Sequence, residues 1–396
     1  MELPGKHIVF IVENLSVPFD RRVWREASAL KNAGYNVSVI CPKGQSKETE
    51  KYISINGINI YRYDIPHIQS SKAGYIKEYS KAFFSSIYLI LKISFRNRIH
   101  AIHVANPPEI FFPLGWLGKL MRFKFIFDHH DLSPETYLCK FGKKDTMYKI
   151  LVKMEKLTFK TSDFVFSTNE SIQKLGIERN KYTAVRTAVV RNGPDKEFQL
   201  SKSDENLKKG KKFLAAYIGI MGVMDGVENI IKAADYIVNV CKYCDIYFIL
   251  MGFGDEYENL KKLVKLYKLK EFISMPGMVY GEEIKVILTT ADVCLAPDPK
   301  NGLNEFLTMN KIMDYMRFGK PIVSFDLFET EFSAKNSAVY VENNDPIGFA
   351  NAIIELLKDP KKMKEMGSFG IERVDKILKW EYFEKVLLNK YSEILA

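Results

Sequence analysis

The amino-acid sequence predicts an α/β protein made of two doubly wound, Rossmann-like domains. Short apolar runs rich in Val, Ile and Phe alternate with segments of helical periodicity, and this alternation stops once near the middle and then restarts. Near-continuous apolar strands separated by helices indicate parallel sheets that helices cover on both faces. The length of 396 residues is enough for two domains that each bury their own core.

The first domain is expected to span residues 1–195. One helix is predicted over Val23–Ala33 and is closed by Gly34, a residue type that suits the left-handed position after a helix C-terminus. The predicted strands of this domain are His7–Val12, Val37–Cys41, Ala101–Val104, Phe123–Asp128 and Phe164–Thr168.

Residues 192–212 are polar and charged without apolar periodicity, which predicts a linker. The second domain is expected over residues 196–375, and residues 376–396 are expected to form a helix that packs back on the first domain. Because ligands of doubly wound sheets bind at the carboxyl ends of the strands, we expect the site in a central cleft that both domains face. The predicted strands of the second domain are Phe213–Gly219, Ile246–Gly252, Asp292–Ala296, Pro321–Phe325 and Ala338–Glu342.

Composition narrows the class of partner. The net charge of +10 suits an anionic partner, which leaves nucleic acid, anionic lipid and phosphorylated ligands open. Nucleic acid is disfavoured because the lysines are spread along the chain and no nucleic-acid-binding motif appears. The N-terminus does not read as a signal peptide, and the apolar run Ala82–Ile93 is too short to span a bilayer. We therefore expect a cytoplasmic protein that can lie peripherally on the inner face of the cell membrane.

Two further cofactor classes are disfavoured. The first strand is followed by Glu13–Pro18, a turn without glycine, whereas a dinucleotide-binding turn needs a glycine-rich sequence. Cys241 and Cys244 form a CxxC, but no second Cys or His pair completes a zinc site. The five cysteines imply no disulfide framework.

The segment Ala296–Phe325, APDPKNGLNEFLTMNKIMDYMRFGKPIVSF, resembles the donor-nucleotide motif of glycosyltransferase family 4. Asp314–Met316 followed by Gly319–Val323 fits the family phrase E-A/Y-M-A-x-G-K/R-P-V/I-V closely. The resemblance implies the GT-B fold and transfer of a sugar from a nucleotide-diphosphate-sugar, expected to be UDP-linked, with retention of configuration and without a metal cofactor. It is strongest to the subset that acts in O-antigen, capsule and exopolysaccharide synthesis, which implies a lipid-linked saccharide acceptor.

The same segment supplies the candidate donor-binding residues. Unpaired N–H groups at a helix start around Leu307, Thr308 and Met309 can hold a diphosphate, and Lys311 can add a full positive charge. The resemblance assigns Asp314 to the ribose hydroxyls and Glu305 to catalysis at the donor sugar. It also places the base beside Gly277 and Met278. The competing interpretation of Lys311 and Asp314 is a solvated pair on a surface helix.

A second resemblance covers Asp128–Glu135, DHHDLSPE, which is similar to the D-x-H-D-x-x-P-E loop of a subset of the family. It identifies His130 as the catalytic histidine, with Asp131 on the acceptor or diphosphate side. Zinc binding by Asp128–Asp131 is disfavoured because adjacent residues on one short loop rarely converge on one ion. Arg21 and Arg22 at the start of the first helix are candidates for an anionic acceptor or the diphosphate, with plain solvation as the alternative.

The sequence also departs from the family. Aligning the glycines after the first strand of the second domain puts Ile220 and Asp225 where most members carry Arg and Lys against the diphosphate. Either Lys311, the helix start and Arg191 compensate, or donor binding is impaired. Glu305 lies one residue earlier than the first acidic position of the motif.

Two alternative functions and one membrane hypothesis remain at this stage. The alternatives are a sugar-nucleotide epimerase of the same architecture and a catalytically silent, membrane-associated partner subunit. The segment 145–161 predicts a helix with a basic face and an apolar face, which can lie on anionic lipid or pack on the protein's own sheet with solvated lysines. The basic face is Lys149, Lys153, Lys156 and Lys160; the apolar face is Met147, Ile150, Leu151, Met154 and Leu157.

Overall fold

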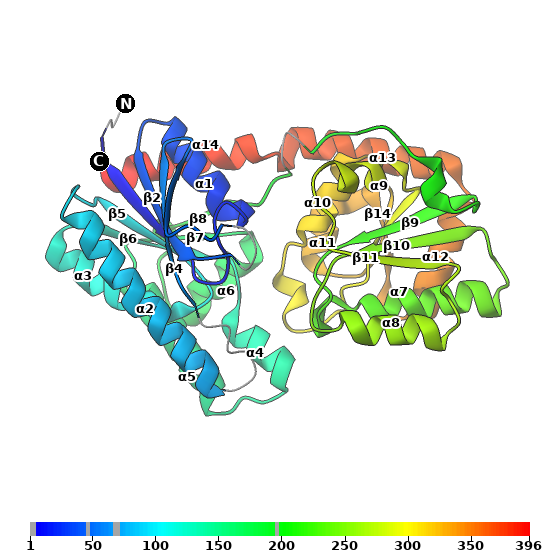
Figure 1. The fold of residues 1–396 in the computed structure, drawn as a ribbon, viewed down its shortest axis with the longest axis horizontal. Coiled ribbons are helices and arrows are strands. Elements are labelled where there is room, and N and C mark those ends of the chain that lie inside the picture. Colours follow the sequence, from blue (N-terminus) through cyan, green and yellow to red (C-terminus); the bar gives the residue numbers. More distant parts are fainter. Residues whose placement is uncertain (1–4, 45–47, 66–71, 195–197) are drawn as a thin grey trace. The chain divides into compact units, whose positions relative to one another are not determined.

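A computed structural model describes residues 5–44, 48–65, 72–194 and 198–396. The chain forms two compact units (Figure 1). Unit 1 comprises Met1–Asn192 together with Glu381–Ala396, and unit 2 comprises Gly193–Trp380. Each unit is an α/β layer structure in which helices cover both faces of one sheet.

In the described part of unit 1, eight strands form a sheet in the order β3-β4-β2-β1-β5-β6-β7-β8. All neighbours are parallel except β3, which runs antiparallel to β4. The order grows outward in both directions from β1, so a topological switch point lies between β1 and β5. The strands are β1 His7–Ile11, β2 Asn36–Pro42, β3 Tyr52–Ile55, β4 Ile58–Tyr63, β5 Ala101–Ala105, β6 Lys124–His129, β7 Phe164–Ser167 and β8 Thr187–Val189.

The hairpin β3–β4 is absent from the sequence prediction, which expected parallel pairing throughout. Its two-residue turn is Asn56-Gly57, and both residues have a positive φ, +51° and +76°. Asn-Gly is the dipeptide that favours such a turn because both central residues need a left-handed backbone. The Asn-Gly dipeptide is visible in the sequence. The prediction that all strands pair in parallel is therefore wrong for β3.

Among the residues of unit 2 that the structure describes, six parallel strands form a sheet in the order β11-β10-β9-β12-β13-β14. Alternate side chains of β9 enter separate cores: Phe213, Ala215 and Tyr217 face one, and Leu214 and Ala216 face the other. This burial on both faces explains why the strands read as continuous apolar runs. The strands are β9 Phe213–Ile218, β10 Ile246–Met251, β11 Ile273–Gly277, β12 Val293–Ala296, β13 Ile322–Phe325 and β14 Ala338–Val341.

The helices of unit 1 include one from the C-terminal end of the chain, α14. The helix α1 begins after Asp20, whose side chain accepts from Val23 N, and it ends before Gly34, which has φ +93°. No helix among the residues described is long and apolar enough to cross a membrane. The helices of unit 1 are α1 Arg21–Asn32, α2 Lys72–Ser94, α3 Pro113–Met121, α4 Ser133–Phe141, α5 Thr146–Thr161, α6 Glu170–Asn180 and α14 Trp380–Leu395.

The polar segment 198–212 packs on unit 2. Ser201 N donates to Thr289 Oγ1 at 3.0 Å, and Lys208 Nζ lies 3.3 Å from Asp292 Oδ2. The helices of unit 2 are α7 Val227–Asp235, α8 Tyr257–Leu266, α9 Glu282–Thr290, α10 Asn310–Arg317, α11 Phe328–Ala334, α12 Pro346–Leu357 and α13 Pro360–Arg373.

Candidate functional site

In unit 1, the expected histidine lies at the carboxyl edge of the sheet, beside the switch point. His130 directly follows β6, and Asn106 directly follows the neighbouring strand β5. The Asn106 side-chain oxygen accepts from the backbone N–H groups of His130 and Asp131 at 2.9 and 3.0 Å. Its amide nitrogen donates to Asp131 O at 2.7 Å. One asparagine therefore fixes the loop that carries the histidine.

The His130 ring is held by a carboxylate. Its Nδ1 lies 3.1 Å from Asp128 Oδ2, and its side chain is 13% exposed. Burial alone would lower the pKa of His130, but the hydrogen bond and charge of Asp128 raise it to about 9. His130 is therefore an imidazolium at neutral pH, with Nδ1–H donating to Asp128 and Nε2–H directed elsewhere.

Asp128 is in turn paired with Arg22. The guanidinium donates to both carboxylate oxygens at 2.7 Å, in the bidentate arrangement that strengthens such pairs. Burial opposes ionisation of Asp128, but the Arg22 charge and the bonds from His130 and Arg22 hold its pKa well below the usual range. Arg22 also donates to Val190 O and Asn192 Oδ1, both at 2.8 Å.

This arrangement corrects the expected role of Arg22, which was a contact to an acceptor or a diphosphate. Its side chain is 6% exposed, and its donors are directed at groups of unit 1. Arg21 lies on the exposed face of the same helix. Asp131 stays 42% exposed with its carboxylate 4.0 Å from His130 Nε2, so it remains available to a ligand.

A second buried layer lies behind Arg22. Glu26 Oε1 is 3.0 Å from Arg22 Nη2, and Glu26 Oε2 is 3.6 Å from His103 Nε2. The other ring nitrogen of His103 lies 2.6 Å from the hydroxyl of Tyr391 on α14. Burial raises the pKa of Glu26 to about 8 and lowers the pKa of His103 to about 4. Sequence reasoning missed this layer because Glu26, His103 and Tyr391 are far apart along the chain.

Glu26, His103 and Asp128 offer ligand atoms within 4.8 Å of one another. They do not fit a metal ion, because the Arg22 guanidinium already bonds both carboxylates and supplies the positive charge. Zinc binding by Asp128–Asp131, which the sequence already disfavoured, is opposed by the position of His129. His129 points into the core, where its ring packs at 82° to Phe159 with centroids 5.1 Å apart.

In unit 2, the expected donor lysine is paired within its own unit. Lys311, in the first turn of α10, donates to both oxygens of Asp298 at 2.7 and 2.8 Å. Asp298 lies in the loop after β12 and is 1% exposed. The Lys311 ammonium also lies 4.9 Å from the centroid of the Tyr217 ring. Sequence reasoning missed Asp298, although its position between two prolines after a strand was visible.

Ile220 and Asp225, the two departures from the family pattern, differ in exposure and in their contacts. Ile220 is 69% exposed. Asp225 turns back into its own loop, where Oδ2 accepts from Gly222 N at 3.0 Å. Burial raises the pKa of Asp225 to about 6, against the opposing charge of Lys311. Lys311 is thus accompanied by two carboxylates.

The remaining donor candidates lie around the start of α10. Asp314 is 6% exposed on that helix, and Met309 caps it without a side-chain hydrogen bond. Leu307 precedes it in an extended conformation. Thr308 Oγ1 donates to Glu329 at 3.4 Å. Glu305 lies 3.3 Å from Lys300 Nζ and also accepts from Phe328 N at 3.3 Å.

The three other candidates, Arg191, Gly277 and Met278, lie outside α10 and the residues that lead into it. Arg191 belongs to unit 1, where it is 2% exposed and forms an ion pair with Glu170 of α6. Gly277 ends β11 with φ +82°, and Met278 after it is 48% exposed. The structure thus removes Arg191 from the residues that unit 2 itself offers a diphosphate.

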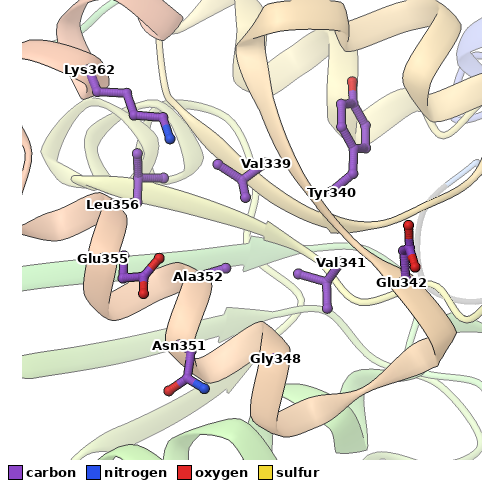
Figure 2. Close-up of a pocket in the computed structure, with 10 residues that line it drawn as sticks. All are labelled: Val339, Tyr340, Val341, Glu342, Gly348, Asn351, Ala352, Glu355, Leu356 and Lys362. Carbon is purple, nitrogen blue, oxygen red and sulfur yellow. The ribbon is translucent and has the colours of Figure 1, made fainter.

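Unit 2 also carries a cavity of about 310 Å³ at the outer strand β14 (Figure 2). Residues of β14, α12 and α13 line it, and their side chains include Val339, Glu355 and Lys362. None of the expected donor residues lies in this cavity. Lys311 lies instead at the carboxyl edge of β9 and β12, where its ammonium contacts Asp298 and the Tyr217 ring, and ligands of doubly wound sheets bind at this edge.

Comparisons with known proteins identify both halves of the chain. Residues 20–198 match the model described as Glycosyltransferase Family 4, and residues 212–359 match the model described as Glycosyl transferases group 1. Together the two models match most of the sequence. No curated protein matches it.

Similar solved structures share the fold over nearly the full length. Sucrose-phosphate synthase from Thermosynechococcus elongatus has a TM-score of 0.76 at 17% identity, covering 98% of this chain and 99% of its own. Anabaena Alr3699/HepE in complex with UDP has a TM-score of 0.72 at 13% identity, covering 98% and 100%. WaaG, a glycosyltransferase involved in lipopolysaccharide biosynthesis, has a TM-score of 0.72 at 11% identity, covering 96% and 98%.

These matches confirm the fold class predicted from the sequence. The two family models fall on the two units, and the solved relatives are similar across both. The chain is therefore a glycosyltransferase of the GT-B fold, similar to family 4.

Proposed function

We propose that this glycosyltransferase moves a hexosyl or N-acetylhexosaminyl group from a UDP-linked donor to a lipid-linked saccharide, with retention, in the synthesis of cell-surface polysaccharide. The observation that carries the donor assignment is the start of α10. Lys311 and Asp314 lie there within the segment matched by the group 1 model. The similar protein HepE was solved with UDP and with UDP-glucose, which supports a UDP-linked donor.

The first turn of α10 is the proposed diphosphate site. Its N–H groups and the Lys311 ammonium stabilise the negative charge that grows on the leaving diphosphate. Asp314 accepts hydrogen bonds from the ribose hydroxyls, and Glu305 contacts the donor sugar. To bind in this way, the diphosphate shares Lys311 with Asp298 or displaces that carboxylate.

In unit 1, His130 serves the transferred sugar. Its charged ring is fixed through Nδ1, so Nε2–H is free to donate to a sugar oxygen. In the transfer, the bond from the anomeric carbon to the diphosphate oxygen breaks and a bond to the acceptor oxygen forms. The acceptor proton goes to the leaving diphosphate. No metal ion takes part in this proposal.

A thermal-shift screen with nucleotide sugars tests the donor assignment, because a ligand that binds only the folded state raises the melting temperature. UDP-sugars should raise it, and at the same ligand concentration the rise should be smaller in Lys311→Ala. A uniform absence of shifts across all nucleotides would favour the catalytically silent partner subunit, for which Asp225 and the Lys311–Asp298 pair are the supporting observations. Product formation without an acceptor, by inversion at a sugar carbon, would favour the epimerase.

We also propose that unit 1 docks on an anionic membrane, where a lipid-linked acceptor is found. The four lysines at positions 149, 153, 156 and 160 of α5 are all exposed. The buried side chains of this helix are Glu155, Thr158, Phe159 and Thr161, so the apolar stripe expected to cover the sheet is only partly buried. Ile150 on that stripe is 43% exposed.

Flotation with vesicles tests this docking. The protein should float with phosphatidylglycerol vesicles at low salt and stay behind with phosphatidylcholine. Changing the four α5 lysines to glutamate should abolish flotation, because each lysine near an anionic surface contributes about 1 kcal/mol. Wild-type protein that stays in the aqueous fraction would instead indicate a soluble acceptor.

A further inference from the structure

Unit 1 has a cavity of about 800 Å³ that the proposed reaction does not use. One side is formed by the hairpin β3–β4 and the residues flanking it, and the other by α2, which packs against β4. The cavity therefore lies at the outer strands of the sheet, whereas His130 follows the inner strand β6.

The lining of this cavity is strongly cationic. It includes Lys51, Arg62, Lys81, Lys92 and Arg96, against a single carboxylate, Asp64. That carboxylate is 2.9 Å from the ammonium of Lys43. Over the described ranges, the three lysines and Arg96 form no ion pair within 4.0 Å, although the charges of Lys51 and Lys81 act on Asp64 and help lower its pKa. The cations outnumber this carboxylate, so the lining favours an anionic ligand.

One of the cations is built into the fold. Arg62 is 4% exposed, and its guanidinium donates to Val17 O at 2.7 Å and to Glu50 O at 3.3 Å. Carbonyl oxygens hold the group without neutralising it. Side chains alternate along a strand, so this guanidinium lies on the face of β4 opposite Tyr61 and Tyr63, which pack in one core with α2. The cations that a ligand in the cavity can reach are therefore the exposed ones at its rim, Lys51, Lys81, Lys92 and Arg96.

The same cavity is flanked by an exposed apolar stripe. Phe84 and Tyr88 line it from α2 and are 70% and 65% exposed. Leu91 and Phe95 continue the stripe at steps of three and four residues, with exposures of 42% and 89%. Apolar side chains at this spacing lie on one face of a helix. A free anion would contact only the cations. An amphiphile would contact the cations with its charged group and the apolar stripe with its acyl chains.

We propose that this cavity binds the phosphate head group of an anionic phospholipid in the membrane on which unit 1 docks. The stripe on α2 enters the boundary between head groups and acyl chains, and the cations close around the phosphate. This inference rests on the proposed membrane docking. The docking proposal itself invokes only a general electrostatic attraction between the α5 lysines and an anionic membrane. The cavity would add a specific binding site for one lipid.

The test compares two triple variants of the full chain. The cavity variant is Lys81→Ala, Lys92→Ala and Arg96→Ala. The matched control is Lys262→Ala, Lys265→Ala and Lys270→Ala, which removes the same charge from exposed positions of unit 2. Dihexanoyl phosphatidylglycerol, used below its micelle concentration, serves as the probe in calorimetry. Inorganic phosphate and glycerol 3-phosphate supply the head-group chemistry without acyl chains.

We expect the lipid probe to bind wild type and the control alike, and to bind the cavity variant at least about tenfold more weakly. Inorganic phosphate and glycerol 3-phosphate should bind much more weakly than the lipid. Equal lipid binding by the cavity variant overturns the proposal, as does a free phosphate that binds as tightly as the lipid.

Vesicle flotation separates this inference from the docking proposal. If the cavity variant floats like wild type while the α5 glutamate variant does not, docking stands and the lipid pocket is wrong. If wild type does not float at all, the docking proposal is wrong. The lipid-pocket proposal is then wrong too, because it requires a membrane that supplies the phospholipid. Unchanged melting temperatures in both triple variants show that the fold is intact.

Discussion

The two units place a cation against a carboxylate at the carboxyl edge of their sheets, yet the central group differs: it is the Asp128 carboxylate in unit 1 and the Lys311 ammonium in unit 2. In unit 1, Asp128 is shared by His130 and Arg22, so two cations face one ionised carboxylate. In unit 2, Lys311 is bonded to Asp298 and has Asp225 near it. Two cations thus surround the Asp128 carboxylate, whereas two carboxylates surround the Lys311 ammonium.

The difference shows that a lysine in a phosphate-binding motif does not by itself make a positive site. A diphosphate that approaches α10 competes with Asp298 for Lys311, and Asp225 opposes it while ionised. In the unit 1 cluster the ring of His130 is held through Nδ1, and its Nε2–H can reach a ligand without breaking the bond to Asp128, with Asp131 4.0 Å away. The two clusters are therefore expected to respond differently to mutation and to pH.

The largest effect is expected at His130. His130→Ala should lower turnover by roughly 10²–10³-fold, the range for losing a positioned hydrogen-bond donor that stabilises the transition state, with nucleotide affinity nearly unchanged. Because the pKa of His130 is about 9, wild-type turnover should fall as the pH rises through that value. Single-turnover kinetics measure the loss of turnover, and calorimetry measures the nucleotide affinity. Retained turnover would make His130 a structural loop residue.

The next effect is on stability and concerns Arg22. Arg22→Leu leaves Asp128 buried without its main partner, which should lower the free energy of unfolding by about 3–5 kcal/mol. The folded-state pKa of Asp128 is depressed, so the stabilisation is present above about pH 4 and is lost as the pH falls further. Urea denaturation at pH 7 and pH 3 should therefore show a smaller difference at the lower pH. Arg21→Leu, one residue away and exposed, is the control.

A smaller loss is expected for the donor residues. Lys311→Ala and Asp314→Ala should each weaken binding of a nucleotide sugar by about 1–3 kcal/mol, as for hydrogen bonds to charged groups. Lys358→Ala, an exposed lysine on the same unit, should leave affinity unchanged. Calorimetry that finds full affinity in both site variants would move the donor away from α10.

The smallest effect should come from Asp225. Burial raises its pKa to about 6, so lowering the pH through 6 neutralises it and should tighten binding of a nucleotide sugar by less than about tenfold. Asp225→Asn keeps an acceptor for Gly222 N, and it should bind tightly at all pH values from 5 to 8. A nucleotide sugar is the correct ligand because its diphosphate does not titrate in this range. Identical pH profiles for the two proteins would exclude repulsion by Asp225.

The sequence by itself determined the layer architecture and most strands, because hydrophobic periodicity reports burial locally. It also predicted the start of α10 and the position of His130 after a strand, since both depend on short continuous segments. The hairpin β3–β4 could have been predicted from Asn56-Gly57. Each of these features depends on residues that are close together in the sequence, so it can be predicted without knowing which distant residues it contacts.

Only the tertiary structure decided what Arg22, Lys311 and Tyr391 do. Arg22 reaches a carboxylate 106 residues away, and Tyr391 bonds a histidine 288 residues away. Such pairs form because parallel strands distant in sequence end at the same edge of a sheet, and because α14 returns to unit 1. Burial then sets the charge state of each group, and burial is a property of the folded neighbourhood that a local pattern does not contain.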